Sequence, residues 1–252
     1  MIRIFTLLIC FLFSAIYGYD QNPHVNPEVW EKISPYFLPE DHPIKPKLDN
    51  LFSQRITANS RRLKKAGFEE PEPRKLSKTI VTKHKKIKGY YFKLFTDDQS
   101  IDDGKQLYTR VLGAERVKNC INRNQLDHLC KVPQKWIYPL PENPPPSKPL
   151  HRKNFILIAE DMELYTKEEN LMKWGNSTLV TTELLDAIYL LLQEEGLKDS
   201  IYPFNMPFSK IDHKIAFIDL EKTREWPIRF KRLIPYLSPE MALYWSALIL
   251  PN

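Results

Sequence analysis

Apolar residues recur at helical spacing in three segments of the chain. They predict helices over residues 104 to about 123, 182–196 and 238–250, with Thr181 or Thr182 starting the second. Ser238 followed by Pro239 is a favourable start for the third. The clearest apolar stripe lies in the second helix and consists of Leu184, Leu185, Ile188, Leu191 and Leu192. The second half of the chain is therefore predicted to be mainly helical.

Strand-like patterns are concentrated in the first half. Residues 79–84 and 88–95 alternate and are rich in β-branched and aromatic residues, so with the basic turn between them they predict a hairpin. Residues 135–138 and the strongly apolar residues 154–159 are two further predicted strands. A short buried strand is predicted at residues 214–219.

The chain before the hairpin has a different character. Residues 19 to about 50 are rich in proline and aromatic residues, and Asn26 followed by Pro27 predicts one short helix. We interpret this part as an arm that wraps the main domain. Residues 51–66 predict a basic helix that ends at Gly67. The first half is thus expected to consist mostly of strands around one helix, which gives an α+β fold.

The first 18 residues have the order of a secretory signal peptide. Arg3 supplies a positive charge, an apolar run follows from residue 4 to 17, and Gly18 precedes a polar segment. The alternative is an uncleaved anchor, but about 14 apolar residues fall short of the ~20 that span a hydrocarbon core. The sequence therefore predicts export to a periplasmic or extracellular location, with no stable membrane span in the mature chain.

Charge is unevenly distributed. The chain has a formal net charge of +6, and its basic residues bunch at residues 61–65 and 83–88. A solvated helix face and a charged turn are the favoured interpretation, and phosphate groups or anionic surfaces are the alternative binding targets. No nucleic-acid-binding motif is present, so no nucleic acid is expected as a partner.

The remaining reactive residues predict little chemistry. Without the signal peptide two cysteines remain, Cys120 and Cys130, which are either a disulfide contributing roughly 2–3 kcal/mol or two buried thiols. The six histidines show no ligand spacing with each other or with the cysteines, so a histidine–cysteine metal site is not expected. Asn176 begins a glycosylation sequon, which matters only in a eukaryotic host.

Residues 196–221 are the most informative segment. Asp199 precedes a loop that contains Asn205, and an apolar strand then delivers a second acid, Asp219, 14 residues after Asn205. This order resembles the active-site segment of the protein-kinase-like superfamily, which includes protein kinases and aminoglycoside phosphotransferases. The resemblance implies that Asn205 and Asp219 hold magnesium against nucleotide phosphates, and that Asp199 is the catalytic acid that orients an acceptor hydroxyl.

The resemblance extends over about residues 76–221. It implies that Lys93, on the second hairpin strand, binds the phosphates of ATP and pairs with Glu115 on the helix that follows. Residues 154–159 and then 160–162 are similar to the fifth strand and the hinge that meets adenine. Residues 182–196 are similar to the long helix that leads to the catalytic loop.

The implied fold is two-lobed and kinase-like, with a small antiparallel sheet lobe containing one helix and a shortened, mainly helical lobe. We expect the boundaries to be a signal peptide at 1–18, an N-terminal extension at 19–67, the sheet lobe at 68–160 and the helical lobe at 161–252.

Two functions fit this fold. One is an ATP- and magnesium-dependent phosphotransferase acting on a protein or small-molecule acceptor, and the retained Asn205 and Asp219 favour it. The other is an inactive, pseudokinase-type binding module that engages a protein partner. Export favours the module, as does the lack of a Gly-x-Gly-x-x-Gly loop before the hairpin. Asp219-Leu220-Glu221 is nearer to the Asp-x-Glu of small-molecule phosphotransferases than to Asp-Phe-Gly.

The export hypothesis predicts a mature N-terminus near Tyr19, because Gly18 is the last small residue before the chain turns polar. Intact-mass measurement of the exported protein checks this. A mass that still includes residues 1–18 would contradict it.

Overall fold

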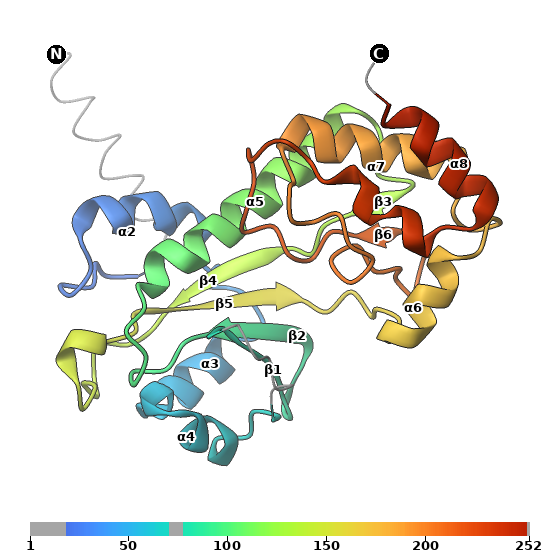
Figure 1. Cartoon of the computed structure of the whole chain (residues 1–252). Coiled ribbons are helices and arrows are strands. Elements are labelled where there is room, and N and C mark those ends of the chain that lie inside the picture. Colours follow the sequence, from blue (N-terminus) through green and yellow to red (C-terminus); the bar gives the residue numbers. More distant parts are fainter. Residues whose placement is uncertain (1–18, 71–77, 251–252) are drawn as a thin grey trace, which may run out of the picture. The chain divides into compact units, whose positions relative to one another are not determined.

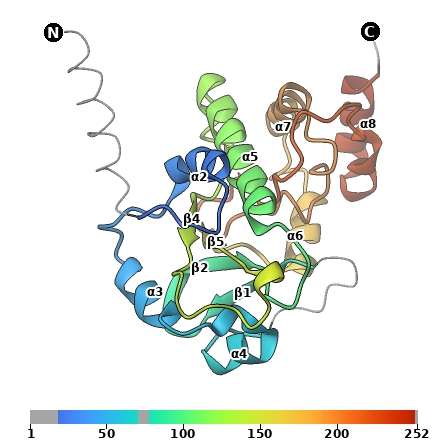
Figure 2. The same ribbon diagram turned by 90° about the vertical axis from the view of Figure 1, so that its left-hand side faces the viewer.

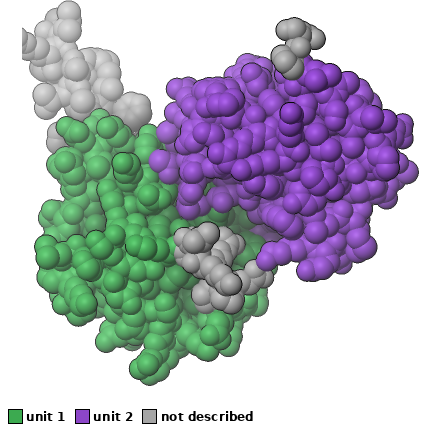
Figure 3. Space-filling model, in the orientation of Figure 1, with its two compact units in different colours: residues 1–108, 135–160 green, residues 109–134, 161–252 purple. Residues whose placement is uncertain are grey.

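The structure is a computed structural model that describes residues 19–70 and 78–250. The predicted signal peptide lies outside the described residues. The chain forms two compact units: unit 1 comprises residues 1–108 and 135–160, and unit 2 comprises residues 109–134 and 161–252 (Figure 3). Among the described helices, none combines the length and the apolar character needed to cross a bilayer.

Unit 1 is built on a four-stranded antiparallel sheet (Figure 1). Its strand order is β1-β2-β5-β4, with the bounds Ile80–His84, Ile87–Leu94, Phe155–Glu160 and Lys135–Pro139. The predicted hairpin and the two later strands are confirmed. With its helices, the sheet gives the chain an α+β fold.

Three helices precede the sheet, α2 (Pro27–Ile33), α3 (Lys45–Phe52) and α4 (Ser60–Lys65). Asn26 caps α2 as predicted, since its side chain accepts the N–H of Glu28 at 2.8 Å. The predicted continuous helix over residues 51–66 is wrong. Asn59 is extended there and accepts the N–H of Arg62, so a new helix begins and the chain turns.

The helices α3 and α4 cover one face of the sheet (Figures 1 and 2). Phe52 and Leu63 are buried in one cluster with Phe92 and Ile158 of the sheet. The N-terminal residues therefore supply helices that complete this core. Phe155 of β5 contacts Trp30, the ring of which lies 6.0 Å away between centroids.

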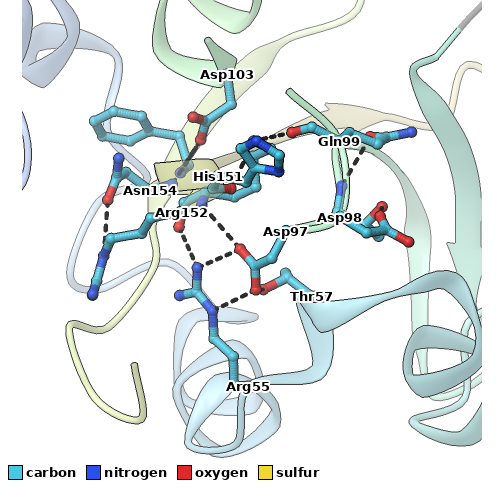
Figure 4. Close-up of polar contacts among 12 residues, drawn as sticks. Arg55, Thr57, Asp97, Asp98, Gln99, Asp103, His151, Arg152 and Asn154 are labelled. Carbon is cyan, nitrogen blue, oxygen red and sulfur yellow. Dashed lines mark hydrogen bonds and ion pairs between the residues drawn. The ribbon is translucent and has the colours of Figure 1, made fainter. Parts of the chain in front are cut away.

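A buried network of charges fixes the start of β5 (Figure 4). Arg55 binds both carboxylate oxygens of Asp97, at 2.9 and 2.7 Å, and donates to the carbonyl oxygen of Lys153 at 2.8 Å. The backbone N–H of Lys153 donates to Asp97, and its ammonium donates to three carbonyl oxygens, those of Gln99, Ile101 and His151. Because Arg55, Asp97 and Lys153 are all buried, these partners replace the water that each group loses.

Asp103 joins the same region to the long helix α5 (Asp103–Arg123), whose first residue it is. Its Oδ2 accepts the backbone N–H groups of Asn154 and Phe155, both at 2.7 Å (Figure 4). Only 3% of Asp103 is exposed, and burial raises the pKa of its carboxyl to about 6. Residues 103–108 of this helix belong to unit 1 and the remainder to unit 2.

Unit 2 is mainly helical, as predicted for the second half. Besides the larger part of α5 it contains α6 (Lys167–Trp174), α7 (Thr182–Glu195) and α8 (Pro239–Leu248). The predicted stripe of α7 is buried, and α8 packs beside α7 (Figure 1). The helix α6 was not predicted, although Thr166 and Glu169 form a capping box at its start.

The predicted strand at residues 214–219 is shorter than expected. Only β6 (Ile215–Ala216) is assigned, and it pairs in parallel with β3 (Cys130–Lys131). Cys120 and Cys130 are both free, buried thiols, so of the two alternatives the pair of thiols is correct and the disulfide is not formed. Burial raises the pKa of each thiol to about 12.

The buried Asp103 predicts a pH-dependent term in stability. Because its pKa rises from 3.8 to about 6 on folding, its stabilising contribution is full below pH 3.8 and is lost as pH rises to about 6. Relative to Asp103→Asn, which is always neutral, the wild-type free energy of unfolding should fall by up to about 3 kcal/mol over this range.

Denaturant unfolding from pH 4 to 7 measures this difference. Asp103→Ala is the matched control, because alanine, like asparagine, does not titrate. It leaves two buried N–H groups unpaired, so it should be about 1–3 kcal/mol less stable than Asp103→Asn at every pH. Parallel wild-type and Asp103→Asn curves would contradict the assignment.

Candidate functional site

The loop after α7 carries two of the predicted site residues, Asp199 and Asn205. It starts at Gly196, whose φ of 61° is left-handed and ends the helix as predicted. A Cβ at Gly196 would lie 2.7 Å from the backbone of Arg224 and of Glu225. Glycine is therefore required here both by conformation and by the close passage of the later chain.

Hydrogen bonds bring Asp199, Asn205 and Asp219 together within unit 2. The side-chain amide of Asn205 donates to the backbone carbonyl oxygen of Asp199 at 2.9 Å, and the backbone carbonyl oxygen of Asn205 accepts the N–H of Ile218 at 3.1 Å. The hydroxyl of Ser200 donates to the carbonyl oxygen of Asp219 at 3.1 Å. The loop and the chain that follows β6 thus lie side by side, which places the three predicted residues in one small region.

The carboxylate of Asp219 contacts a cation of the chain itself. Arg110, on α5, binds Asp219 at 2.9 Å through Nη1 and Glu221 through Nη2. Only 8% of the Arg110 side chain is exposed, against 40% for that of Asp219. Sequence reasoning missed Arg110, because an arginine 109 residues before its partner carries no local signal of pairing.

A close backbone contact holds the same helix against this segment. A Cβ at Gly113 of α5 would lie 1.8 Å from the carbonyl oxygen of Leu220, so no larger residue fits without moving the backbone. Leu220 lies between Asp219 and Glu221, and Arg110 is one helical turn before Gly113. The absent side chain of Gly113 therefore lets α5 approach closely enough for Arg110 to reach both acids.

Asp199 is surrounded by positive charge. Lys222 binds its carboxylate at 2.8 Å, and Arg229 lies 4.0 Å from it. The hydrogen bond from Lys222, aided by the charges of Lys222, Arg229 and Arg232, lowers the pKa of Asp199. The acid is therefore ionised near neutral pH and can accept a hydrogen bond from a hydroxyl.

The other two predicted residues are described each in its own unit. Lys93 is half-buried on β2 of unit 1, where it pairs with Val81 of β1 and Leu157 of β5. Glu115 is exposed on the part of α5 that belongs to unit 2. Within a single unit, the structure brings together Asp199, Asn205 and Asp219.

Asn205 and Asp219 carry oxygen donors of the kind that magnesium takes. The described part of the chain contains no group of three histidine, cysteine, aspartate or glutamate side chains arranged to hold a metal ion. Magnesium needs fewer protein ligands, because it keeps several waters and is held by one or two carboxylates together with substrate phosphates. Asn205 and Asp219 fit such a site, provided that the metal competes with Arg110 for the carboxylate of Asp219.

Comparison with known proteins yields no match. No protein-family model matches the chain, and no curated protein matches it significantly. The functional argument therefore depends on the geometry of the chain itself.

The Gly113 contact predicts a large effect of a single methyl group. Gly113→Ala should lower the free energy of unfolding by about 1–3 kcal/mol or more, because the obstacle is a backbone carbonyl that cannot rotate away. Gly175→Ala is the matched control in the same unit, since its Cβ would lie 3.7 Å from its nearest neighbour. Denaturant unfolding of both variants checks this, and equal stabilities would contradict the close approach.

Proposed function

We propose that this chain is an exported, kinase-like protein that binds a nucleotide with magnesium through the loop around Asn205 and through Asp219. The supporting observation is the hydrogen-bonded convergence of Asp199, Asn205 and Asp219, three residues that the kinase resemblance selects by residue type and spacing. Residues separated by 20 positions meet there through hydrogen bonds donated by Ser200, Asn205 and Ile218.

The sheet of unit 1 supports the same proposal. β2, which carries Lys93, pairs along residues 90–93 with β5, the strand that the resemblance places before the hinge. Lys93 is opposite Leu157 in this register. In the proposed protein Lys93 binds nucleotide phosphates as a compact cation, and its partner in that role is Glu115.

The proposed chemistry is positioning and charge stabilisation. Asn205 and Asp219 would hold magnesium, which when bound neutralises phosphate charge. Asp199, kept ionised by Lys222 and its neighbours, would accept the hydrogen bond of an acceptor hydroxyl and orient it. The acceptor is a protein or a small molecule.

A second function is favoured by the ion pairs of Arg110. A buried guanidinium already balances Asp219 and Glu221, so this segment has a counter-charge without any metal. Such an arrangement suits an inactive, pseudokinase-type module that keeps its fold in order to engage a protein partner. The two functions differ in whether magnesium displaces the arginine.

Calorimetric titration with ATP and ADP, with and without magnesium, tests the proposal. We expect magnesium to increase the affinity for nucleotide. Asp219→Asn should remove most of this increase, because the acid acts through the metal. Lys93→Met should weaken binding with or without metal. Asp127→Asn, an exposed acid of unit 2, is the matched control and should bind as the wild type does.

The outcomes separate the two functions. Binding with phosphate transfer to an acceptor supports the enzyme, and binding without transfer supports a nucleotide-stabilised pseudokinase. If the folded protein gives no heat and no thermal shift at millimolar nucleotide, nucleotide binding is rejected and the partner-binding module remains.

A further inference from the structure

The two basic clusters of the sequence, which are 18 residues apart in the chain, form one surface in unit 1. The basic surface comprises residues 61–70, on α4 and the turn after it, and residues 83–88 of the β1–β2 hairpin. Phe68 bridges His84 as in an antiparallel sheet, and the N–H of Lys85 donates to the carbonyl oxygen of Gly67 at 3.1 Å. Figure 1 shows α4 below this hairpin.

A buried histidine fastens the two parts. His84 accepts the N–H of Lys86 at Nδ1, at 3.2 Å, so its Nε2 donates to the carbonyl oxygen of Ala66 at 3.0 Å. Both ring nitrogens therefore have a hydrogen-bond partner. The spacing between the basic residues of α4 and those of the hairpin is therefore set by backbone groups rather than by their own side chains.

The basic surface has the same net charge as the whole chain. Its sixteen residues include eight basic and two acidic ones, a net charge of +6, which equals the formal net charge of all 252 residues. Seven of the basic side chains are exposed, namely Arg61, Arg62, Lys64, Lys65, Lys85, Lys86 and Lys88. One of them, Lys64, is paired with Glu70 at 2.8 Å in an exposed ion pair that contributes little.

The apolar residues of this surface face inward. Leu63, Phe68 and Ile87 are each at most 3% exposed and belong to the core of unit 1. What the basic surface presents is therefore charge alone, on a helix and a turn that project outward. A protein partner is normally anchored by an apolar or aromatic side chain in a pocket, and single-stranded nucleic acid by stacking on aromatic rings.

We propose that the basic surface binds anionic phospholipid membranes. A cluster of four to eight lysines and arginines gains attraction from each residue near a negatively charged leaflet, without any shaped pocket. Lipid headgroups offer the continuous sheet of phosphate charge that a surface with seven exposed basic side chains can meet. The interaction is peripheral, and it is independent of the proposed nucleotide binding.

Sedimentation with vesicles tests this in the full chain. The protein should bind vesicles of phosphatidylcholine with about one third phosphatidylserine, and binding should disappear as salt rises well above about 0.1 M. Vesicles of phosphatidylcholine alone are the reference. The apolar run of residues 4–17 would partition into both kinds, so only the difference between them reports the basic surface.

Charge variants locate the interaction. Lys65→Gln with Lys86→Gln should weaken binding to anionic vesicles about thirtyfold, and the corresponding glutamate pair should weaken it further, because glutamate reverses both charges. Lys32→Glu with Lys231→Glu changes the net charge equally at exposed sites outside the basic surface and should bind nearly as the wild type does. Far-UV circular dichroism confirms that each variant is folded.

Three results would overturn the proposal. These are no binding of the folded wild type to anionic vesicles, equal binding to neutral ones, or equal losses in the two double glutamate variants. A DNA duplex, titrated in parallel, covers the other polyanion, and binding to DNA without binding to anionic vesicles would also overturn it.

Discussion

Unit 1 depends on one physical constraint, which is that a buried charge must keep its partners. Arg55 and Asp97 lose their water on folding, and removing either partner of such a pair usually costs about 3–5 kcal/mol. The pair is completed by the backbone of Lys153, so residues 42 and 98 positions from Arg55 must arrive together. The segment that carries Arg55 is therefore part of the core of unit 1.

The same constraint determines where α5 begins. The ammonium of Lys153 is satisfied by carbonyl groups of the chain just before α5, and Asp103 then accepts two N–H groups at the start of β5. With its first turn bonded to β5, the helix has a defined start and a defined phase. Arg110 and Gly113 lie on the part of the helix that belongs to unit 2, and there they meet Asp219 and Leu220.

Cap residues in the sequence were sufficient to predict where some helices begin and end. Thr181 and Gly196 bound α7 because a hydroxyl cap and a left-handed glycine act within one turn. The break at Asn59 was missed, since the basic residues around it have high helix propensity and only the cap shows that a new helix begins. β6 is short because its partner strand β3 has two residues, a limit set by a distant segment.

In the candidate site, too, some residues could be predicted from the local sequence and others depend on distant segments. Asp199, Asn205 and Asp219 could be selected from residue types and spacing, whereas the cations that contact them could not. In the sequence, Arg110 cannot be distinguished from a solvated arginine on a helix. Its burial depends on Gly113, which allows the backbone of Leu220 to approach. Whether Asn205 and Asp219 bind magnesium stays a prediction.

Arg110 is the cation with which any metal at the candidate site must compete. Arg110 is buried between two carboxylates, where a low dielectric strengthens the attraction and the planar guanidinium can bind both. A divalent ion that enters must exceed this attraction and leave the arginine with water or phosphate as its new partner. Nucleotide phosphates can provide that partner, because they are acceptors for a displaced guanidinium. Metal and nucleotide are therefore expected to bind Asp219 together more readily than the metal does alone.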